Sequence, residues 1–242
     1  MNDLTIYDTW APQWWTGSAR WLRTLHNLVP ARLAYFDKLV PRWDGADVLD
    51  LGCGGGFMSV ALARRGAQVT AIDPSAGAID AGQRHAAEKR LDIDFRRGFG
   101  EDLDMPDSSV DVVVCVDVLE HVTDVPRTLD EITRVLRPGG MFLFDTINRN
   151  WLARLLVVTM AEDVLRLLPK GAHDPDLFIK PGELRGQLSQ RGFEDIRLAG
   201  LGPKGLNHRL DLTFGQVPTT LVQYMGGARL DAPAIIAESI EL

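Results

Sequence analysis

Short apolar stretches alternate with helical patterns along residues 47–146, and this alternation constrains the fold more than any other feature of the sequence. The first stretch, 47–51, runs into glycines, and the helical pattern over 124–136 stops at 137–140, where proline ends a helix and glycine turns the chain. Strands that alternate with helices form a parallel sheet with helices on both faces. We expect strands at 47–51, 68–72, 93–97, 110–115 and 141–146, and helices at 58–65, 76–90 and 124–136.

The regions on either side of this alternating part have different patterns. The first forty residues are helical in pattern and rich in aromatic side chains, so we expect a helical cover that packs over the rest. Residues 151–168 are apolar but carry four charged residues, which predicts an inserted amphipathic helix and not a membrane span. Weaker strand signals follow at 193–199 and 219–225, and we expect the last dozen residues to be poorly ordered.

The length of 242 residues predicts one domain, which we divide by pattern. The parts are an N-terminal helical cover (1–45), a ligand-binding core (46–147), a lid or amphipathic insertion (148–185), and C-terminal strands with a tail (186–242).

Charge and cysteine content exclude several classes of protein. Thirty-three acidic residues against 26 basic ones give a net charge of −7, which disfavours nucleic acid as the main partner. The two cysteines, Cys53 and Cys115, lack metal-type spacing, which is typical of a reduced cytoplasmic protein. The first residues do not resemble a secretory signal, and no apolar stretch is long enough to cross a bilayer. We therefore expect a cytoplasmic protein.

The glycines after the first strand form a ligand-binding loop in an acidic setting. Phe57 stands where the dinucleotide pattern Gly-x-Gly-x-x-Gly needs its last glycine, and no P-loop lysine follows. The remaining pattern, Asp-x-Gly-x-Gly-x-Gly, begins with Asp50, whose carboxylate repels pyrophosphate but suits a cofactor with a sulfonium and an ammonium. Asp73 ends the second strand and is placed to accept two ribose hydroxyls, which would also fit a dehydrogenase. The alternative is that both acids only cap helices.

Residues 47–146 resemble a class I S-adenosylmethionine-dependent methyltransferase. The resemblance implies an α/β fold: a doubly wound, Rossmann-like methyltransferase sheet that is mostly parallel, has one antiparallel strand and carries helices on both faces. It also implies that the adenine lies near Gly100 and Glu101, although Phe99 stands where many relatives have an aspartate. The motifs that carry it are DLGCGGG (50–56), DPS (73–75), GFGEDL (98–103), LEHV (119–122) and LRPGG (136–140).

A closer resemblance, over residues 7 to about 190, is to the ubiquinone-biosynthesis O-methyltransferases, which methylate hydroxyls of polyprenylated phenols and catechols. It is carried by WW (14–15), PARL (30–33), TINRN (146–150), LPKGAHD (168–174) and FIKPGEL (178–184). It implies that Arg32 and the backbone at Val116 contact S-adenosylmethionine. The resemblance weakens after Pro203, so the substrate need not be a ubiquinone precursor. The expected cofactor-binding residues are Arg32, Asp50, Gly52, Gly54, Asp73, Gly100, Glu101 and Val116.

The turn after the fourth strand holds the candidate catalytic residues. If that turn is helical, Asp117, Glu120 and His121 share one side, where they would bind Mg²⁺ or another divalent metal, as mitochondrial relatives do. The alternatives are that His121 acts alone as a general base on the substrate hydroxyl, or that the turn is only scaffold. His173 is a second acid/base candidate, with a buried histidine bonded to backbone as its alternative.

Several functional alternatives stay open at this point. The expected partner is a small aromatic substrate, methylated on oxygen, with a C- or N-methyltransferase of a secondary metabolite as the runner-up. A nicotinamide-dependent oxidoreductase and a cofactor-binding module without catalysis are more distant alternatives. The segment 151–168 is expected to lid the substrate pocket or to make a peripheral membrane contact where a polyprenyl substrate resides, and neither role excludes the other. The oligomeric state is left open.

Overall fold

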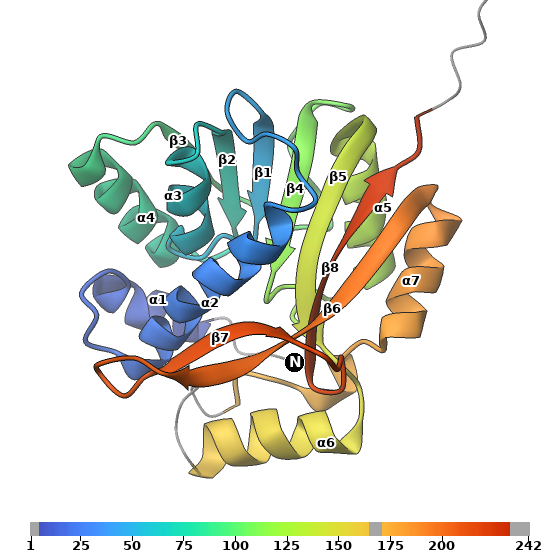
Figure 1. Ribbon diagram of the computed structural model, residues 1–242. Coiled ribbons are helices and arrows are strands. Elements are labelled where there is room, and N and C mark those ends of the chain that lie inside the picture. The colour runs from blue at the N-terminus through green and yellow to red at the C-terminus, as the bar shows by residue number, and fades with distance from the viewer. Residues whose placement is uncertain (1–4, 165–170, 233–242) are drawn as a thin grey trace, which may run out of the picture.

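The computed structural model describes residues 5–164 and 171–232. Five parallel strands form the first part of the sheet, in the order β3-β2-β1-β4-β5. Their arrowheads point toward the end of the molecule where α1 and α6 lie, which is therefore the carboxyl edge of the sheet (Figure 1). The strands are β1 (Asp47–Leu51), β2 (Gln68–Asp73), β3 (Ile93–Arg97), β4 (Val110–Val116) and β5 (Leu136–Ile147).

Three further strands extend the sheet beyond β5 in the order β8-β6-β7. The expected antiparallel strand is β8 (Gln223–Leu230), which pairs antiparallel with both β5 and β6 (Phe193–Leu206). The sequence did not predict β7 (Leu212–Val217), which pairs antiparallel with the second half of β6 and so adds another reversed strand at the edge. The doubly wound, mostly parallel α/β sheet expected from the sequence is confirmed.

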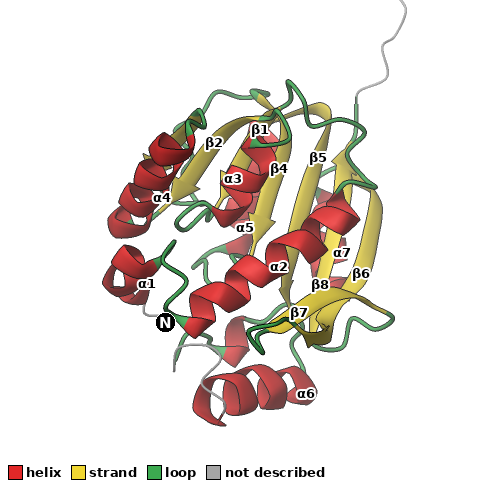
Figure 2. Cartoon of the chain, turned by 60° about the vertical axis from the view of Figure 1, so that its left-hand side comes forward, coloured by secondary structure: helices red, strands yellow, loops and turns green. Residues whose placement is uncertain are grey.

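Both faces of the sheet are buried, as its central strand shows. Along β4, Val112 and Val114 pack into one apolar cluster, and Val113 and Cys115 pack into another on the opposite face. Successive side chains of a strand point to opposite faces, so a continuous apolar run is what a sheet covered on both sides requires. Helices α2 (Arg20–Phe36), α3 (Phe57–Ala63) and α4 (Ala76–Lys89) cover the first face, and α5 (Val125–Val135) and α7 (Pro181–Gln190) cover the second (Figures 1 and 2).

Helix ends differ from the expected ones by only one or two residues because local caps set them. Ser75 caps α4 by accepting a hydrogen bond from the backbone of Ala78, and Asp124 caps α5 in the same way. The expected helix stop is confirmed, since α5 ends at Val135, but no turn separates the helix from β5, which begins at the next residue. Leu136 already pairs with Val110, so the proline and glycines of the stop lie inside the strand.

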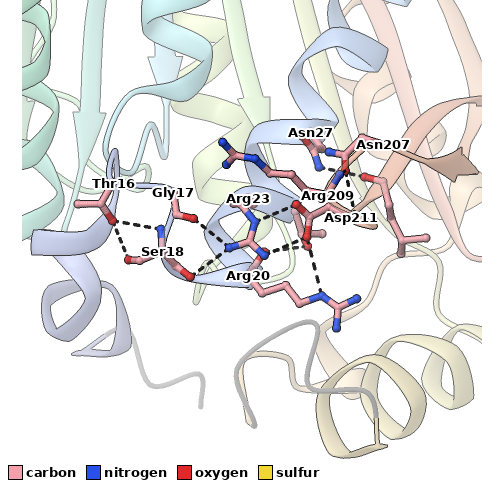
Figure 3. A network of polar contacts seen from close by, with 11 residues as sticks. Thr16, Gly17, Ser18, Arg20, Arg23, Asn27, Asn207, Arg209 and Asp211 are labelled. Atoms are coloured by element: carbon pink, nitrogen blue, oxygen red, sulfur yellow. Dashed lines mark hydrogen bonds and ion pairs between the residues drawn. The ribbon is translucent and has the colours of Figure 1, made fainter.

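The N-terminal cover consists of α1 (Thr5–Trp10), the short helix η1 (Ala11–Gln13) and α2. A polar network fastens α2 to the turn between β6 and β7 (Figure 3). Arg23 donates two hydrogen bonds to the carboxylate of Asp211, at 2.8 and 3.0 Å, and Asp211 is only 3% exposed. Asn27 donates to the backbone of Leu212 at 3.1 Å. Because α2 also carries Arg32, this network holds a candidate site residue in place.

The insertion begins with α6 (Trp151–Ala153), which continues as a π-helix, η2 (Arg154–Val164), and it ends with the short helix η3 (Pro175–Leu177). It lies at the carboxyl edge of the sheet, below the β6–β7 hairpin in Figure 1. The expected end of this helix at Leu168 lies outside the described residues, and so do all but the first two of the last dozen residues, for which we expected disorder. No helix of the described part is both long and apolar enough to cross a membrane.

Candidate active site

A cavity of about 510 Å³ opens at the carboxyl ends of β1, β2 and β4. This is the edge at which open α/β sheets bind their ligands, and the volume lies within the usual range for small-molecule sites. All eight residues that the sequence nominated for cofactor binding line this cavity. They are Arg32, Asp50, Gly52, Gly54, Asp73, Gly100, Glu101 and Val116. Their contact with a cofactor stays a prediction, but the fold brings them together.

The loop after β1 is held close to β2 by its own backbone. The N–H groups of Gly52 and Cys53 both donate to the carbonyl of Ile72, at 2.8 and 3.1 Å. Gly52 has a φ of +70°, and a Cβ atom there would lie 2.1 Å from a methyl group of Val118. The loop therefore needs glycine at position 52 for both conformation and space.

Asp73 faces this loop from the end of β2. Its carboxylate accepts hydrogen bonds from the backbone of Gly54 and of Ser75, each at 2.8 Å. Burial raises the pKa of Asp73 to about 6, because desolvation disfavours the charged form. Asp73 thus orders the glycine loop and presents a partly desolvated carboxylate to the cavity.

The cavity lining carries more negative than positive charge. Asp50 is 1% exposed; one of its oxygens accepts from Ser59, and the other has no hydrogen-bond partner among the described residues. Burial raises the pKa of Asp50 to about 6. Together with Asp73 and Asp117 it lines a cavity in which Arg32 is the one Lys or Arg of the described lining. A cofactor with a sulfonium and an ammonium fits this charge balance, whereas a pyrophosphate would be repelled.

Arg32 is buried between two carboxylates. It donates to Asp145 at 2.6 Å and forms a short ion pair with Asp117, while Asp145 also accepts from the backbone of Asp117 at 2.8 Å. Asp145 is fully buried, and burial raises its pKa. The sequence reading missed Asp145, although it stands at the end of an apolar strand, as Asp50 and Asp73 do.

The turn after β4 is not helical, which corrects the expectation for Asp117. This residue has a φ of +54°, and its carboxylate is engaged by Arg32 and by Gln223, whose amide donates at 3.2 Å. Asp117 is therefore turned to Arg32, and not to Glu120 and His121 as the helical spacing implied. Aspartate tolerates this left-handed conformation better than most residues do.

Glu120 and His121 instead meet His173 from the insertion. One ligand atom of each residue can be chosen so that all three lie within 4.8 Å of one another. The centres of the two imidazole rings are 5.2 Å apart. Glu120 is 1% exposed and accepts from the hydroxyl of Thr146 at 2.6 Å. His121 lines the cavity, and burial lowers its pKa to about 3, so its imidazole is neutral at physiological pH.

The alternative for His173 was a buried histidine bonded to backbone. Its hydrogen bond is instead to a side chain. Its Nδ1 lies 2.7 Å from Oε1 of Glu162, which is 2% exposed. The other oxygen of Glu162 accepts from the backbone of Gly171 at 2.8 Å. The sequence analysis counted Glu162 only as a polar position of an amphipathic helix. The one sign of a buried role in the sequence is that its carboxylate stands within an apolar stretch.

The cavity is closed by the N-terminal cover and by the loop after β3. Tyr7 and Trp14 of the cover line it, as expected for an aromatic segment that packs over something else. At the rim, Glu101 accepts from the backbone and the hydroxyl of Thr123, each at 2.9 Å. Phe99 is 55% exposed beside it. Glu101 therefore shapes the rim through Thr123.

Comparison with known proteins identifies the family of this chain. Residues 49–144 match a family model described as a methyltransferase domain. A ubiquinone biosynthesis O-methyltransferase of Coxiella burnetii is 36% identical over 212 residues, which cover 88% of this chain and 90% of that protein. One of the same name from Alkalilimnicola ehrlichii is 36% identical over 224 residues, covering 92% and 90%. The chain belongs to the ubiquinone biosynthesis O-methyltransferase family.

Solved structures show the same fold at low sequence identity. A protein from Thermotoga maritima, named as a possible histamine N-methyltransferase, superposes with a TM-score of 0.67 at 18% identity, covering 94% of this chain and 99% of that one. Magnesium protoporphyrin IX methyltransferase from Synechocystis, solved with bound SAH, gives 0.66 at 19% identity, covering 94% and 95%. As a member of its family, the chain is an S-adenosylmethionine-dependent methyltransferase, as the sequence predicted. The relatives favour this activity over a nicotinamide-dependent oxidoreductase.

Asp73→Ala is expected to weaken S-adenosylmethionine binding in this family member by about 5- to 150-fold, the equivalent of about 1–3 kcal/mol for charge-assisted hydrogen bonds. The carboxylate is expected to accept the ribose hydroxyls at the end of β2, and it also orders the loop through the backbone N–H of Gly54. Calorimetric titration with the cofactor measures the effect. Asp94→Ala, on the exposed part of β3, is the control and should bind normally. Unchanged cofactor affinity in Asp73→Ala would exclude a contact between this carboxylate and the ribose.

Proposed function

We propose that the chain transfers the methyl group of S-adenosylmethionine to a phenol- or catechol-type hydroxyl of a small aromatic substrate, such as a polyprenylated quinone precursor. The observation that carries the proposal is the position of His121. Its half-buried imidazole lines the same cavity as the glycine loop and Asp73. A hydroxyl bound between them would face both a proton acceptor and the bound cofactor. The names of the relatives support methylation on oxygen.

The chain's own residues bind, orient and deprotonate in this proposal. When bound, S-adenosylmethionine supplies an already reactive methyl group, so the protein contributes mainly positioning. The glycine loop, Asp73 and the Arg32 cluster hold the cofactor side of the cavity. Apolar side chains of the lining, among them Leu25, Val29 and Val118, exclude water from the bound aromatic substrate.

A phenol has a pKa of about 10, so the hydroxyl needs help to lose its proton at neutral pH. His121 accepts that proton as the oxygen bonds to the methyl group; Glu120 and His121 could instead hold a divalent ion, which would supply Lewis-acid chemistry at the hydroxyl. Two imidazoles and a buried carboxylate have donor atoms suited to a divalent ion, so the residues present fit such a group. The proposal includes this ion.

The function is tested by turnover with defined acceptors. Purified protein is given S-adenosylmethionine with catechols that carry or lack a short prenyl tail, and the product is identified by mass spectrometry and NMR. We expect methylation on a ring hydroxyl, with the prenylated catechol as the better acceptor. Methyl transfer to carbon or nitrogen, or no transfer to any phenol by protein that binds the cofactor, would overturn the proposal.

We also propose that the insertion makes a peripheral membrane contact. Trp151 is 76% exposed, and Leu155, Leu156 and Met160 of the same helix are each at least 36% exposed. Leu221, 53% exposed, follows Thr220 in the turn before β8, close to the start of the insertion, where Asn150 donates to its carbonyl. Exposed aromatic and aliphatic side chains in one region are typical of helices that lie in the membrane interface, where a polyprenyl chain resides.

Trp151→Asp combined with Leu155→Asp is expected to reduce binding to lipid vesicles by at least about tenfold, since each change removes apolar area from the interface and adds a charge. Co-sedimentation with vesicles measures it, and the affinity for S-adenosylmethionine should stay unchanged. Equal sedimentation of variant and wild type would contradict the membrane contact.

A further inference from the structure

Tyr7 of the N-terminal cover brings a hydroxyl group into the cavity. The side chain is half-buried and lines the cavity wall. Its ring packs against Trp14 and Trp21, with ring centres 6.3 and 6.1 Å away. Within the part of the chain that the structure describes, the hydroxyl makes no hydrogen bond. A tyrosine hydroxyl that leaves bulk water usually has a partner, so we looked for one in a bound molecule.

We propose that Tyr7 determines substrate specificity: its hydroxyl donates a hydrogen bond to a second oxygen on the substrate ring, next to the oxygen that is methylated. The inference deepens the proposed function, on which it rests, because it narrows the substrate from phenols in general to rings with two adjacent oxygens. His121 accepts the proton of one oxygen and Tyr7 donates to the other, so two contacts fix the orientation of the ring.

The position of Tyr7 is fixed by the next residue, Asp8. The carboxylate of Asp8 accepts hydrogen bonds from the hydroxyl of Ser75 at 2.6 Å and from the backbone N–H of Gly77 at 3.0 Å. Both partners lie at the start of α4, directly after β2, and α1 lies beside α4 in both views (Figures 1 and 2). A Cβ atom at Gly77 would lie 3.0 Å from that of Ala11, so the cover approaches α4 closely. These contacts hold α1, and Tyr7 with it, at the carboxyl edge of the sheet.

The two tryptophans that follow η1 hold the cover on the glycine loop. Nε1 of Trp15 donates to the carbonyl of Gly55 at 2.9 Å. The indole of Trp14 lies against the loop so closely that a Cβ atom at Gly54 or Gly55 would be 2.5 or 2.3 Å from it. Glycine at these two positions therefore leaves room for the cover. The cover is a fixed wall of the cavity, which gives the hydroxyl of its tyrosine a defined place.

The charges around Tyr7 place its hydroxyl between the cofactor side and the catalytic side of the cavity. Burial raises the pKa of Tyr7, and four carboxylates raise it further. They are Asp117, Asp73, Glu120 and Glu162. The first two lie on the cofactor side, and the other two lie with the catalytic histidines. The hydroxyl therefore keeps its proton and acts as a donor close to where the methyl group passes to the substrate.

A hydroxyl in this position discriminates between substrates through the cost of leaving it unpaired. When a ring without the second oxygen binds, the hydroxyl of Tyr7 loses contact with water and gains no partner. When a ring with an adjacent oxygen binds, that oxygen accepts the hydrogen bond. Sites that hydrogen-bond a substrate group reject analogues without it far more strongly than apolar walls reject a change of size. Tyr7 therefore supplies a selectivity that the apolar lining does not.

Calorimetric titration tests the inference without any need for turnover. The full chain, saturated with S-adenosylhomocysteine, is titrated with a catechol and with the matched phenol in which hydrogen replaces the second hydroxyl. We expect the wild type to bind the catechol about 5- to 150-fold more tightly, the range for a buried polar group left without its partner. Tyr7→Phe keeps the aromatic ring and removes the hydroxyl, so it should bind the two rings about equally well.

Tyr35→Phe is the matched control, because Tyr35 belongs to α2 and is not among the described residues that line the cavity. It should keep the preference of the wild type for the catechol. The affinity for S-adenosylhomocysteine should be unchanged in both variants, which shows that the cover and the cofactor loops are folded.

Two outcomes would overturn the inference: a wild type that binds both rings equally well, or an unchanged catechol preference in Tyr7→Phe. If that variant instead loses affinity for S-adenosylhomocysteine and keeps the preference, the hydroxyl contacts the cofactor and the inference falls. The proposed function fails separately. If the catechol is methylated on oxygen and Tyr7→Phe keeps the preference, the function stands. If the preference depends on Tyr7 and neither ring is methylated on oxygen, the contact stands and the function falls.

Discussion

Gly52→Ala is expected to abolish binding of S-adenosylmethionine while the sheet stays folded. The new Cβ would lie 2.1 Å from a methyl group of Val118, and the residue would still need a φ of +70°. The left-handed conformation costs alanine about 1–2 kcal/mol, and inserting a carbon into a packed site costs about 1–3 kcal/mol. The loop relieves both only by shifting from its position, so we expect an affinity at least about 100-fold lower, measured by calorimetry.

Gly45→Ala is the matched control for this experiment. Gly45 also has a positive φ, +77°, but nothing lies within 4 Å of the position of its Cβ atom, and it precedes β1 at the opposite edge of the sheet. It should lose a similar amount of stability to backbone strain and bind the cofactor normally. If Gly52→Ala binds as well as Gly45→Ala does, the cofactor does not approach the glycine loop.

His121→Ala is expected to lower the rate of methyl transfer by about two to four decades while cofactor affinity stays close to normal. The imidazole lines the cavity, is neutral, and lies within reach of both Glu120 and His173. Its removal takes away either the proton acceptor or a ligand of the ion. Single-turnover measurements with a saturating catechol report the chemical step.

Chelator treatment separates the two roles of His121. With an ion in the site, we expect chelator to abolish turnover and a first-row divalent ion to restore it. Without an ion, chelator has no effect and His121 acts as a base. Full activity of His121→Ala, together with no effect of chelator, would reduce the turn after β4 to scaffold.

The cofactor side of the site could be predicted because its signals are local. Asp50 and Gly52 stand at the end of β1, and Asp73 stands at the end of β2. The resemblance to the family, and not a strand signal, nominated Arg32, Gly100, Glu101 and Val116. Parallel strands bring their carboxyl ends to one edge, so the order of strands and glycines along the chain already implies the cavity. The structure places all of these residues in its lining.

The catalytic side could not be predicted in the same way because its partners are distant in the sequence. Helical spacing grouped Asp117 with Glu120 and His121, but a left-handed residue at Asp117 sends its carboxylate to Arg32, 85 residues away. The amphipathic pattern of the insertion identified Glu162 only as polar. Its burial against His173 depends on how the insertion packs on the turn after β4.

The sequence by itself determined the strand-and-helix order, the glycine loop and the acids at the strand ends, because strand period, helix caps and glycine backbone freedom act over a few residues. The tertiary structure alone decided that Arg32 is paired with Asp117 and Asp145, and that Glu120, His121 and His173 meet with Glu162 behind them. Such groupings depend on which buried charges the packed elements bring within a few ångströms. Burial makes those contacts strong, and no local pattern in the chain encodes them.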